Sequence, residues 1–171
     1  MQIDLHELRA EDIPRLAATD GGPAWKGHDK RWKRYLADQS QGLRVVLLAE
    51  MAGGIVAYGS LVWASQHPHF RNAGIPEIQD LVVAQRQRRA GLGTRMIRAL
   101  EDRARAAGCT QVGLGVGLYR DYGAAQRLYQ SLGYLPDGEG VSYHNAPVTP
   151  GATVKVDDHL VLWLVRELKN T

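Results

Sequence analysis

The sequence predicts a mixed α/β fold in which helices lie on the faces of a twisted sheet. Three observations support this fold class. The 171 residues, 44% hydrophobic and 23% charged, suit one compact globular domain. Stretches with strand-like alternation are interleaved with stretches of helical spacing. Glycine and proline separate these stretches without a linker or an internal repeat, so a single domain over residues 1–171 is expected.

The first third of the chain predicts a strand followed by two helices. Residues 2–8 alternate as a strand does, and Pro14 suits the first turn of a short helix. A glycine-rich turn at residues 21–23 precedes a second expected helix over 25–39. Two β-branched and apolar runs, 43–50 and 55–63, follow around a short Gly-Gly turn, which predicts a β-hairpin.

The middle of the chain predicts a loop, a strand and a long helix. Residues 65–75 have no clear period and are expected to form a loop, while Glu77 to Val83 predicts a strand that runs directly into the next helix. Gly108 is placed to end this helix. Its apolar stripe consists of Leu92, Met96, Ile97, Leu100, Ala104 and Ala107.

The last third predicts a strand at 111–116, a helix that ends at Gly133, an irregular hairpin or flap at 137–158 and a final strand at 160–165. In total, about seven strands and four helices are expected. Because the strand-to-helix crossovers occur only in the middle, the sheet should be mixed rather than wholly parallel.

Composition limits the function classes. The net charge of +3 is too small to indicate nucleic-acid binding unless the cations cluster. Cys109 is the only cysteine, which argues against a disulfide framework or a thiolate metal site and favours a cytoplasmic location. Residues 1–10 carry Asp4 and Glu7 where a signal peptide would be apolar, so no membrane anchor is expected.

The segment Arg88-x-x-Gly91-x-Gly93 stands where a strand ends and a helix begins, and it predicts an anion site. The first amide groups of a helix lack intrahelical partners and lie at its positive end, so a phosphate can accept several hydrogen bonds there. A tight turn with a solvated arginine face is the alternative. A dinucleotide fingerprint is less well supported, because its third glycine is missing. The surrounding arginines are Arg86, Arg88, Arg89, Arg95 and Arg98.

This segment resembles the pyrophosphate loop of the GNAT acetyltransferase superfamily. A second motif, Leu128-Tyr129-Gln130-Ser131-Leu132-Gly133-Tyr134, is similar to the Leu-Tyr helix that follows in that family, and the two motifs come in the family's order. The resemblance implies a single, mostly antiparallel twisted sheet and acetyl-coenzyme A as co-substrate, without a metal. It also implies transfer of the acetyl group to an amine by direct attack on the thioester.

The resemblance further implies where coenzyme A would bind. Its pantetheine arm would pair with the backbone of Leu81 and Val83 between the strand that ends at Val83 and the one that ends near Val116, and one amide in this stretch would polarise the thioester carbonyl. Tyr122 stands where many members have an asparagine that holds the arm, which puts the local contacts in doubt. The implied cofactor-binding residues are Leu81, Val82, Val83, Arg88, Arg89, Ala90, Gly91, Leu92, Gly93, Thr94 and Tyr122.

The attacking amine must be neutral, and keeping a lysine-like amine deprotonated at pH 7 costs roughly 4–5 kcal/mol. A carboxylate is therefore expected to receive the proton. Glu77 occupies the family position and is favoured over Asp80, although both could be solvated strand-edge charges. A bulge could turn either side chain to the site. Tyr129 matches the family's acid, with plain core packing as the alternative.

The acceptor amine is not specified by the sequence. A small molecule or a peptide would suit, and a homodimer is possible, whereas nucleic-acid and membrane partners are not expected. A non-catalytic acyl-coenzyme A sensor is the alternative function. No histidine is assigned a catalytic role, and His67 and His69 are expected at the surface. The family's acceptor site would include Trp25, Trp32, Tyr35, His67, Phe70, Tyr143 and His144, with Glu77, Asp80 and Asp121 as acidic groups.

Overall fold

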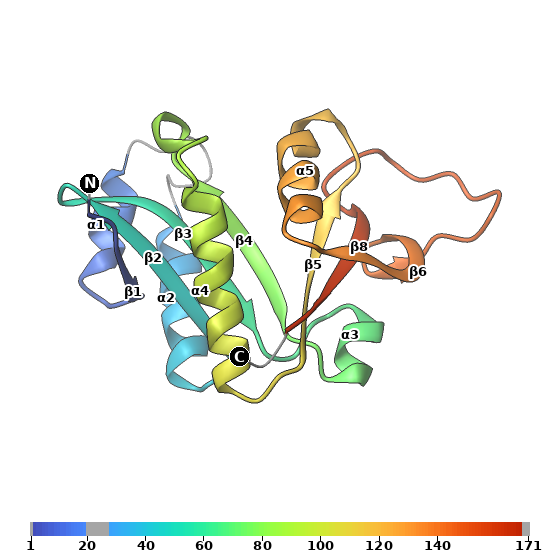
Figure 1. Ribbon diagram of the computed structural model, residues 1–171, viewed down its shortest axis with the longest axis horizontal. Helices are drawn as coiled ribbons and strands as arrows, with labels where there is room; N and C mark the ends of the chain where they lie inside the picture. The colour runs from blue at the N-terminus through green and yellow to red at the C-terminus, as the bar shows by residue number, and fades with distance from the viewer. Residues whose placement is uncertain (1, 20–27, 169–171) are drawn as a thin grey trace. The chain divides into compact units, whose positions relative to one another are not determined.

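The structure is a computed structural model that describes residues 2–19 and 28–168 (Figure 1). The strands are β1 Asp4–Glu7, β2 Arg44–Met51, β3 Gly54–Val62, β4 Glu77–Val83, β5 Gln111–Gly117, β6 Leu135–Tyr143, β7 Ala146–Pro147 and β8 Leu160–Glu167. The helices are α1 Asp12–Ala18, α2 Asp29–Ser40, α3 Pro68–Ala73, α4 Leu92–Ala106 and α5 Gly123–Ser131.

The strands are hydrogen-bonded in the order β1-β2-β3-β4-β5-β8-β6-β7. Strands β4 and β5 are parallel, whereas the pairs β1–β2, β2–β3, β5–β8, β6–β8 and β6–β7 are antiparallel. This confirms the predicted mixed, mostly antiparallel sheet, with eight strands and five helices among the described residues. The chain forms two compact units, Met1–Val62 with Gln79–Arg103 and Trp63–Ile78 with Ala104–Thr171. The expectation of one domain over 1–171 stays a prediction.

In the first unit, β2 and β3 form the predicted hairpin, with Met51 paired to Gly54. Ala52 and Gly53 between them have φ of 50° and 79°, as a two-residue turn that matches the strand twist requires. Helices α1 and α2 lie on one side of this hairpin and α4 on the other (Figure 1). The core between α1, α2 and the strands contains Leu8, Ile13, Leu16, Trp32, Tyr35, Val46, Leu48, Ile55, Tyr58 and Ala84.

In the second unit, β5 lies between β4 and β8, with Glu77 opposite Gly113 and Gly115 opposite Trp163. Glycines recur at every second residue of β5, so they share one face. A Cβ atom at Gly113 would lie 2.1 Å from the Phe70 ring, and one at Gly115 would lie 3.0 Å from the Trp163 ring. Because Gly113 and Gly115 have no side chain, the rings of Phe70 and Trp163 can occupy the space beside them.

Helix α3 lies in the stretch that was expected to be a loop. Pro68 begins it and Gly74, with φ of 67°, ends it. Its six residues are too few to show a helical period in the sequence, and Phe70, which is fully buried, is the side chain that packs it against the unit. Part of the expected flap is also regular, because β6 extends to Tyr143 despite a register shift between Pro136 and Val141.

Candidate functional site

The connection from β4 to α4 has an irregular, outward-facing backbone. A 3₁₀ turn at Gln85–Gln87 leads to extended backbone at Arg88, and both Arg89 and Gly91 then have positive φ, 65° and 77°. Such a conformation is strained for an arginine, and strained backbone of this kind is concentrated at functional loops. Helix α4 follows at once, and the Arg95 amide donates to the Gly91 carbonyl at 3.1 Å.

The amide groups of this loop are available to a ligand. Within the described part of the chain, none of the backbone N–H groups of residues 89–94 has a hydrogen-bond partner. Residues 88–91 are exposed, and Gly93 and Thr94 are half-buried. Unpartnered donors at the positive end of a helix favour an anion with several oxygens, such as a diphosphate.

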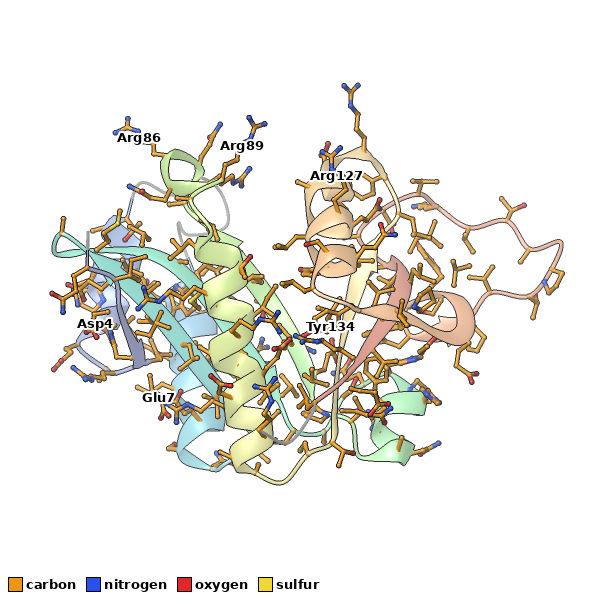
Figure 2. The ribbon with its side chains drawn as sticks, in the orientation of Figure 1. Asp4, Glu7, Arg86, Arg89, Arg127 and Tyr134 are labelled. Carbon is orange, nitrogen blue, oxygen red and sulfur yellow. The ribbon has the colours of Figure 1, made fainter. Side chains whose placement is uncertain are left out.

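Arg86 and Arg89 add positive charge to the loop, and both side chains reach outward from the ribbon (Figure 2). Neither of them makes an ion pair with a described residue. The predicted arginine cluster is therefore only partly available for an anion. Its other members are held by the protein: Arg88 by the Val83 carbonyl, Arg95 by the Ile3 carbonyl and Arg98 by the Glu101 carboxylate.

Strand β4 is interrupted at Asp80, whose φ is 53°. A positive φ within a strand is a backbone irregularity that can turn a side chain to the other face of the sheet. On the sequence alone, such a change of direction was possible for both Glu77 and Asp80. Leu81, Val82 and Val83 follow Asp80 and are half-buried. They are the residues expected to pair with an extended ligand, and this pairing stays a prediction.

The Asp80 carboxylate already has one hydrogen-bond donor and one ion-pair partner. The Tyr35 hydroxyl donates to its Oδ2 at 2.5 Å, and Arg44 Nη1 lies 3.6 Å from the same oxygen. Burial, followed by the negative charge of Asp80, raises the pKa of Tyr35 to about 12. The phenol is thus a hydrogen-bond donor to Asp80 throughout the neutral range.

Glu77 is in the second unit, at the start of β4, and is 6% exposed. The Ser65 hydroxyl, which is fully buried, donates to Glu77 Oε2 at 2.5 Å and accepts from the His67 backbone amide at 2.9 Å. The favoured carboxylate is therefore linked through Ser65 to the residues that begin α3. It is not the solvated strand-edge charge that the sequence left as an alternative.

Tyr129 lies on α5 and is half-buried, with its ring centroid 6.1 Å from that of Tyr134. Burial raises the pKa of Tyr129 to about 12. Its hydroxyl has no hydrogen-bond partner among the described residues. A phenol in this state stays protonated at neutral pH and has its proton available for a ligand.

Tyr122 precedes α5 and is already engaged by the protein. Its hydroxyl donates to Asp158 Oδ1 at 2.9 Å, and Tyr119 donates to the same oxygen. The ring also fills the space beside Gly117, where a Cβ atom would lie 2.4 Å from a ring carbon. A direct contact of the Tyr122 hydroxyl with coenzyme A therefore competes with Asp158, and the assignment of Tyr122 as a cofactor residue stays a prediction.

Comparison with models of known protein families shows to which family the chain belongs. The sequence model of the Acetyltransferase (GNAT) family matches residues 5–134. The chain belongs to the GNAT acetyltransferase family. The matched residues include the loop of residues 88–94 and the Leu-Tyr pair, so both motifs lie in the GNAT region. None of the curated proteins matches the chain in sequence.

Solved structures agree on the GNAT fold. An N-acetyltransferase from Staphylococcus aureus is 16% identical, with a TM-score of 0.72 over 99% of this chain and 100% of the other. The ribosomal-protein-alanine N-acetyltransferase of Brucella melitensis is 20% identical, with a TM-score of 0.70 over 96% and 99%. The yncA protein of Salmonella typhimurium, solved with its cofactor acetyl-CoA, is 21% identical, with a TM-score of 0.65 over 100% and 96%.

His67 is the residue whose surroundings differ most from expectation. It was expected at the surface of this GNAT chain, yet it is 5% exposed. Its Nε2 lies 2.8 Å from Asp137 Oδ2, and its ring stacks on that of Trp163, with a centroid distance of 4.3 Å and an interplanar angle of 1°. No local sequence signal could have found this site, because Asp137 is 70 residues away in the chain.

The aromatic residues proposed for the GNAT acceptor site divide into two groups. Trp32, Tyr35 and Phe70 are buried in the cores of their units, so their rings serve packing. Tyr143 is half-buried and His144 exposed, and both remain candidates. Trp25 lies outside the described residues.

Two further findings concern the described residues alone. Within 2–19 and 28–168, every helix is too short or too polar to cross a lipid bilayer. These same residues contain no group of three or more His, Cys, Asp or Glu side chains arranged to hold a metal ion. The expectation that no metal takes part stays a prediction.

Proposed function

We propose that this GNAT chain transfers the acetyl group of acetyl-coenzyme A to an amine of a small molecule or peptide by direct attack on the thioester. The loop of residues 89–94 carries the proposal, because its exposed amides lack partners and Arg86 and Arg89 stand beside them. A diphosphate provides the oxygens that such donors require. Membership of the acetyltransferase family supports the same reaction.

The chain's residues fit coenzyme A in two ways. The backbone amides of residues 89–94, which include those of Ala90 and Leu92, would hold the diphosphate. The backbone of the half-buried residues Leu81 to Val83 would pair with the pantetheine arm. Acetyl-coenzyme A would supply the activated acetyl group. One amide of the Leu81 to Val83 stretch would donate to the thioester oxygen, where negative charge develops in the transition state.

Two proton transfers complete the proposal. Tyr129 would give its proton to the departing sulfur, and its raised pKa of about 12 keeps that proton in place until it is needed. A second group must receive the proton of the amine. Glu77 and Asp80 are the candidates from the sequence, and Asp80 is the less suitable because Tyr35 and Arg44 already contact its carboxylate.

The acceptor class is open between a small molecule and a peptide. The Brucella neighbour is named for ribosomal-protein alanine, so peptides that begin with alanine belong in the set to be tested. A homodimer and a cytoplasmic location are kept as proposals. The second rests on the single cysteine.

The experiment is release of free thiol from acetyl-coenzyme A, measured over amines, amino acids and short peptides. Calorimetry with coenzyme A is run in parallel. Binding with acetyl transfer supports the proposal, and binding without transfer to any acceptor supports a non-catalytic sensor instead. Absence of binding at millimolar coenzyme A would overturn both readings.

A further inference from the structure

Asp80 is the exposed carboxylate of strand β4. Its side chain is 37% exposed, whereas Glu77, the other carboxylate of this strand, is buried. The two protein groups that contact the Asp80 carboxylate are the Tyr35 hydroxyl and Arg44 Nη1, and both approach Oδ2. No described residue donates a hydrogen bond to Oδ1. Oδ1 is therefore the oxygen left to accept a hydrogen bond from a ligand.

The contacts on Oδ2 fix the direction of this carboxylate. The Tyr35 ring packs edge-on against Trp32, with a centroid distance of 5.9 Å, and the Arg44 guanidinium carbon lies 4.0 Å from the Tyr35 centroid. Arg44 is also anchored, because Nη1 donates to Ser60 Oγ at 2.8 Å and Nη2 donates to Gln79 Oε1 at 3.3 Å. Packing and hydrogen bonds of this kind hold a binding group in one position.

Asp80 also lies next to the residues that are expected to hold the thioester, and all of them belong to the first unit. The Asp80 carboxylate faces Tyr35 of α2. The Leu81 side chain instead lies beside Leu100 of α4, since a Cβ atom at Gly59 would be 3.3 Å from each leucine. Covalent geometry keeps the Asp80 carboxylate within about 6 Å of the Leu81 amide nitrogen. An amine on Oδ1 can therefore reach a thioester carbonyl that accepts from this amide.

A primary amine has one N–H more than acetylation consumes. When its nitrogen attacks through the lone pair, the nitrogen holds two protons, and only one of them must leave. The other proton stays in the amide product. An N-methyl amine has no N–H to retain, because its single proton must leave. An oxygen placed to accept the retained N–H would direct the attack of a primary amine and would lose its partner with an N-methyl amine.

We propose that Asp80 Oδ1 accepts the N–H that the acceptor amine retains, and that this hydrogen bond directs the nitrogen to the thioester carbon. The inference rests on the proposed acetyltransferase function. As nitrogen bonds to the acetyl carbon, the carbon–sulfur bond breaks and its electron pair leaves with sulfur, which takes the proton of Tyr129. One amine proton passes to the base, for which Glu77 remains the candidate, and the other stays on nitrogen. Asp80 thus binds the acceptor and does not take its proton.

The test pairs each primary amine that the thiol-release screen finds with its N-methyl derivative, for example a peptide that begins with alanine and one that begins with N-methylalanine. The wild-type protein should favour the primary amine by about 10²-fold or more in kcat/KM. Asp80→Asn should lower kcat/KM for the primary amine by about 10–10²-fold. It should leave kcat/KM for the N-methyl amine nearly unchanged, so that the preference falls by the same factor.

Asparagine is the informative replacement because it keeps the shape of the side chain. The Tyr35 hydroxyl and Arg44 are donors and orient the amide oxygen towards themselves, which places the amide NH₂ group at the position of Oδ1, where it cannot accept. Asp38→Asn is the matched control. The Asp38 carboxylate also lies beside Arg44, 3.8 Å from Nε, but it is on α2, so this variant should keep the wild-type preference.

Two measurements keep the outcome interpretable. Urea unfolding and calorimetry with coenzyme A should show that both variants fold and bind the cofactor as the wild type does. The preference of the wild type for primary amines needs no variant and is a test in itself.

Three results would overturn the role of Asp80 and leave the acetyltransferase function in place. In the first, the wild type acetylates the N-methyl amine as efficiently as the primary one. In the second, Asp80→Asn matches the wild type with both amines. In the third, Asp80→Asn slows both amines by the same factor, as expected if Asp80 took the proton. If the wild type releases no thiol with any amine, the acetyltransferase function itself fails, and the role of Asp80 fails with it.

Discussion

The Tyr122 hydroxyl donates a hydrogen bond of 2.9 Å to the Asp158 carboxylate, and this contact joins the turn before α5 to the residues that precede β8. The Tyr122 ring lies against Gly117 at the end of β5. Helix α5 carries Tyr129, seven residues or about two helical turns after Tyr122. The position of the proposed acid therefore depends on a glycine that leaves room for an aromatic ring.

Gly117→Ala should destabilise the protein, because the new Cβ atom would lie 2.4 Å from a ring carbon of Tyr122. We expect the free energy of unfolding in urea to fall by about 1–3 kcal/mol, as in other overpacked sites. Combining it with Tyr122→Ala should remove most of that clash. If the double variant is no more stable than the sum of the two single changes predicts, this packing account is wrong.

Gly91→Ala should weaken the anion loop through backbone strain rather than collision. A Cβ atom at Gly91 would meet nothing within 4 Å, but its φ of 77° is unfavourable for alanine by roughly 1–2 kcal/mol. Affinity for coenzyme A, measured by calorimetry, should fall by about tenfold. Gly123→Ala is the control, because that site is equally open and has φ of −56°. Equal affinity of both variants would contradict the prediction.

Tyr129→Phe should lower kcat for acetyl transfer by about 10²-fold or more without weakening coenzyme A binding. The change removes only a hydroxyl that has no partner among the described residues, so stability should change little. Because burial raises the pKa of Tyr129 to about 12, the wild-type enzyme should not lose this acid below about pH 11. An unchanged kcat in the variant would exclude Tyr129 from the mechanism.

Ionisation of Tyr35 should lower the stability of the folded protein at alkaline pH. Its pKa is raised from 10.0 to about 12 in the folded state, so the unfolded chain loses the phenolic proton first as the pH rises. The stability that this group contributes is complete below about pH 10 and is lost between about pH 10 and 12, by roughly 2–3 kcal/mol.

Urea unfolding of Tyr35→Phe at several pH values tests this effect. The variant should be less stable at pH 7, since it lacks the hydrogen bond to Asp80, yet its stability should fall less steeply between about pH 10 and 12. Parallel curves for the variant and the wild type would show that Tyr35 ionises at its ordinary pKa in the folded protein.

Much of the fold was predictable because its signals are local. The β-branched and apolar runs on either side of Gly53 predict the β2–β3 hairpin, and the apolar stripe that Gly108 closes predicts α4. The motif around Gly91 likewise predicts an anion-binding turn at the start of a helix, since unpartnered amides and positive φ depend on neighbouring residues. The 3₁₀ turn at Gln85–Gln87, which separates β4 from α4, was not predicted. Helix α3 has only six residues, too few for a period, and was not predicted.

The surroundings of single side chains depended on contacts between distant segments. The resemblance to the GNAT family marked Glu77 and Tyr129 as candidates, with Asp80 as the rival base, but it could not show that Asp80 meets Tyr35 or that Ser65 binds Glu77. The spacing of the two histidines placed His67 at the surface, whereas Asp137 and Trp163 enclose it. Local chain geometry follows from nearby residues, but burial and pairing arise only when strands far apart in sequence come together, and no periodic pattern encodes which side chains then meet.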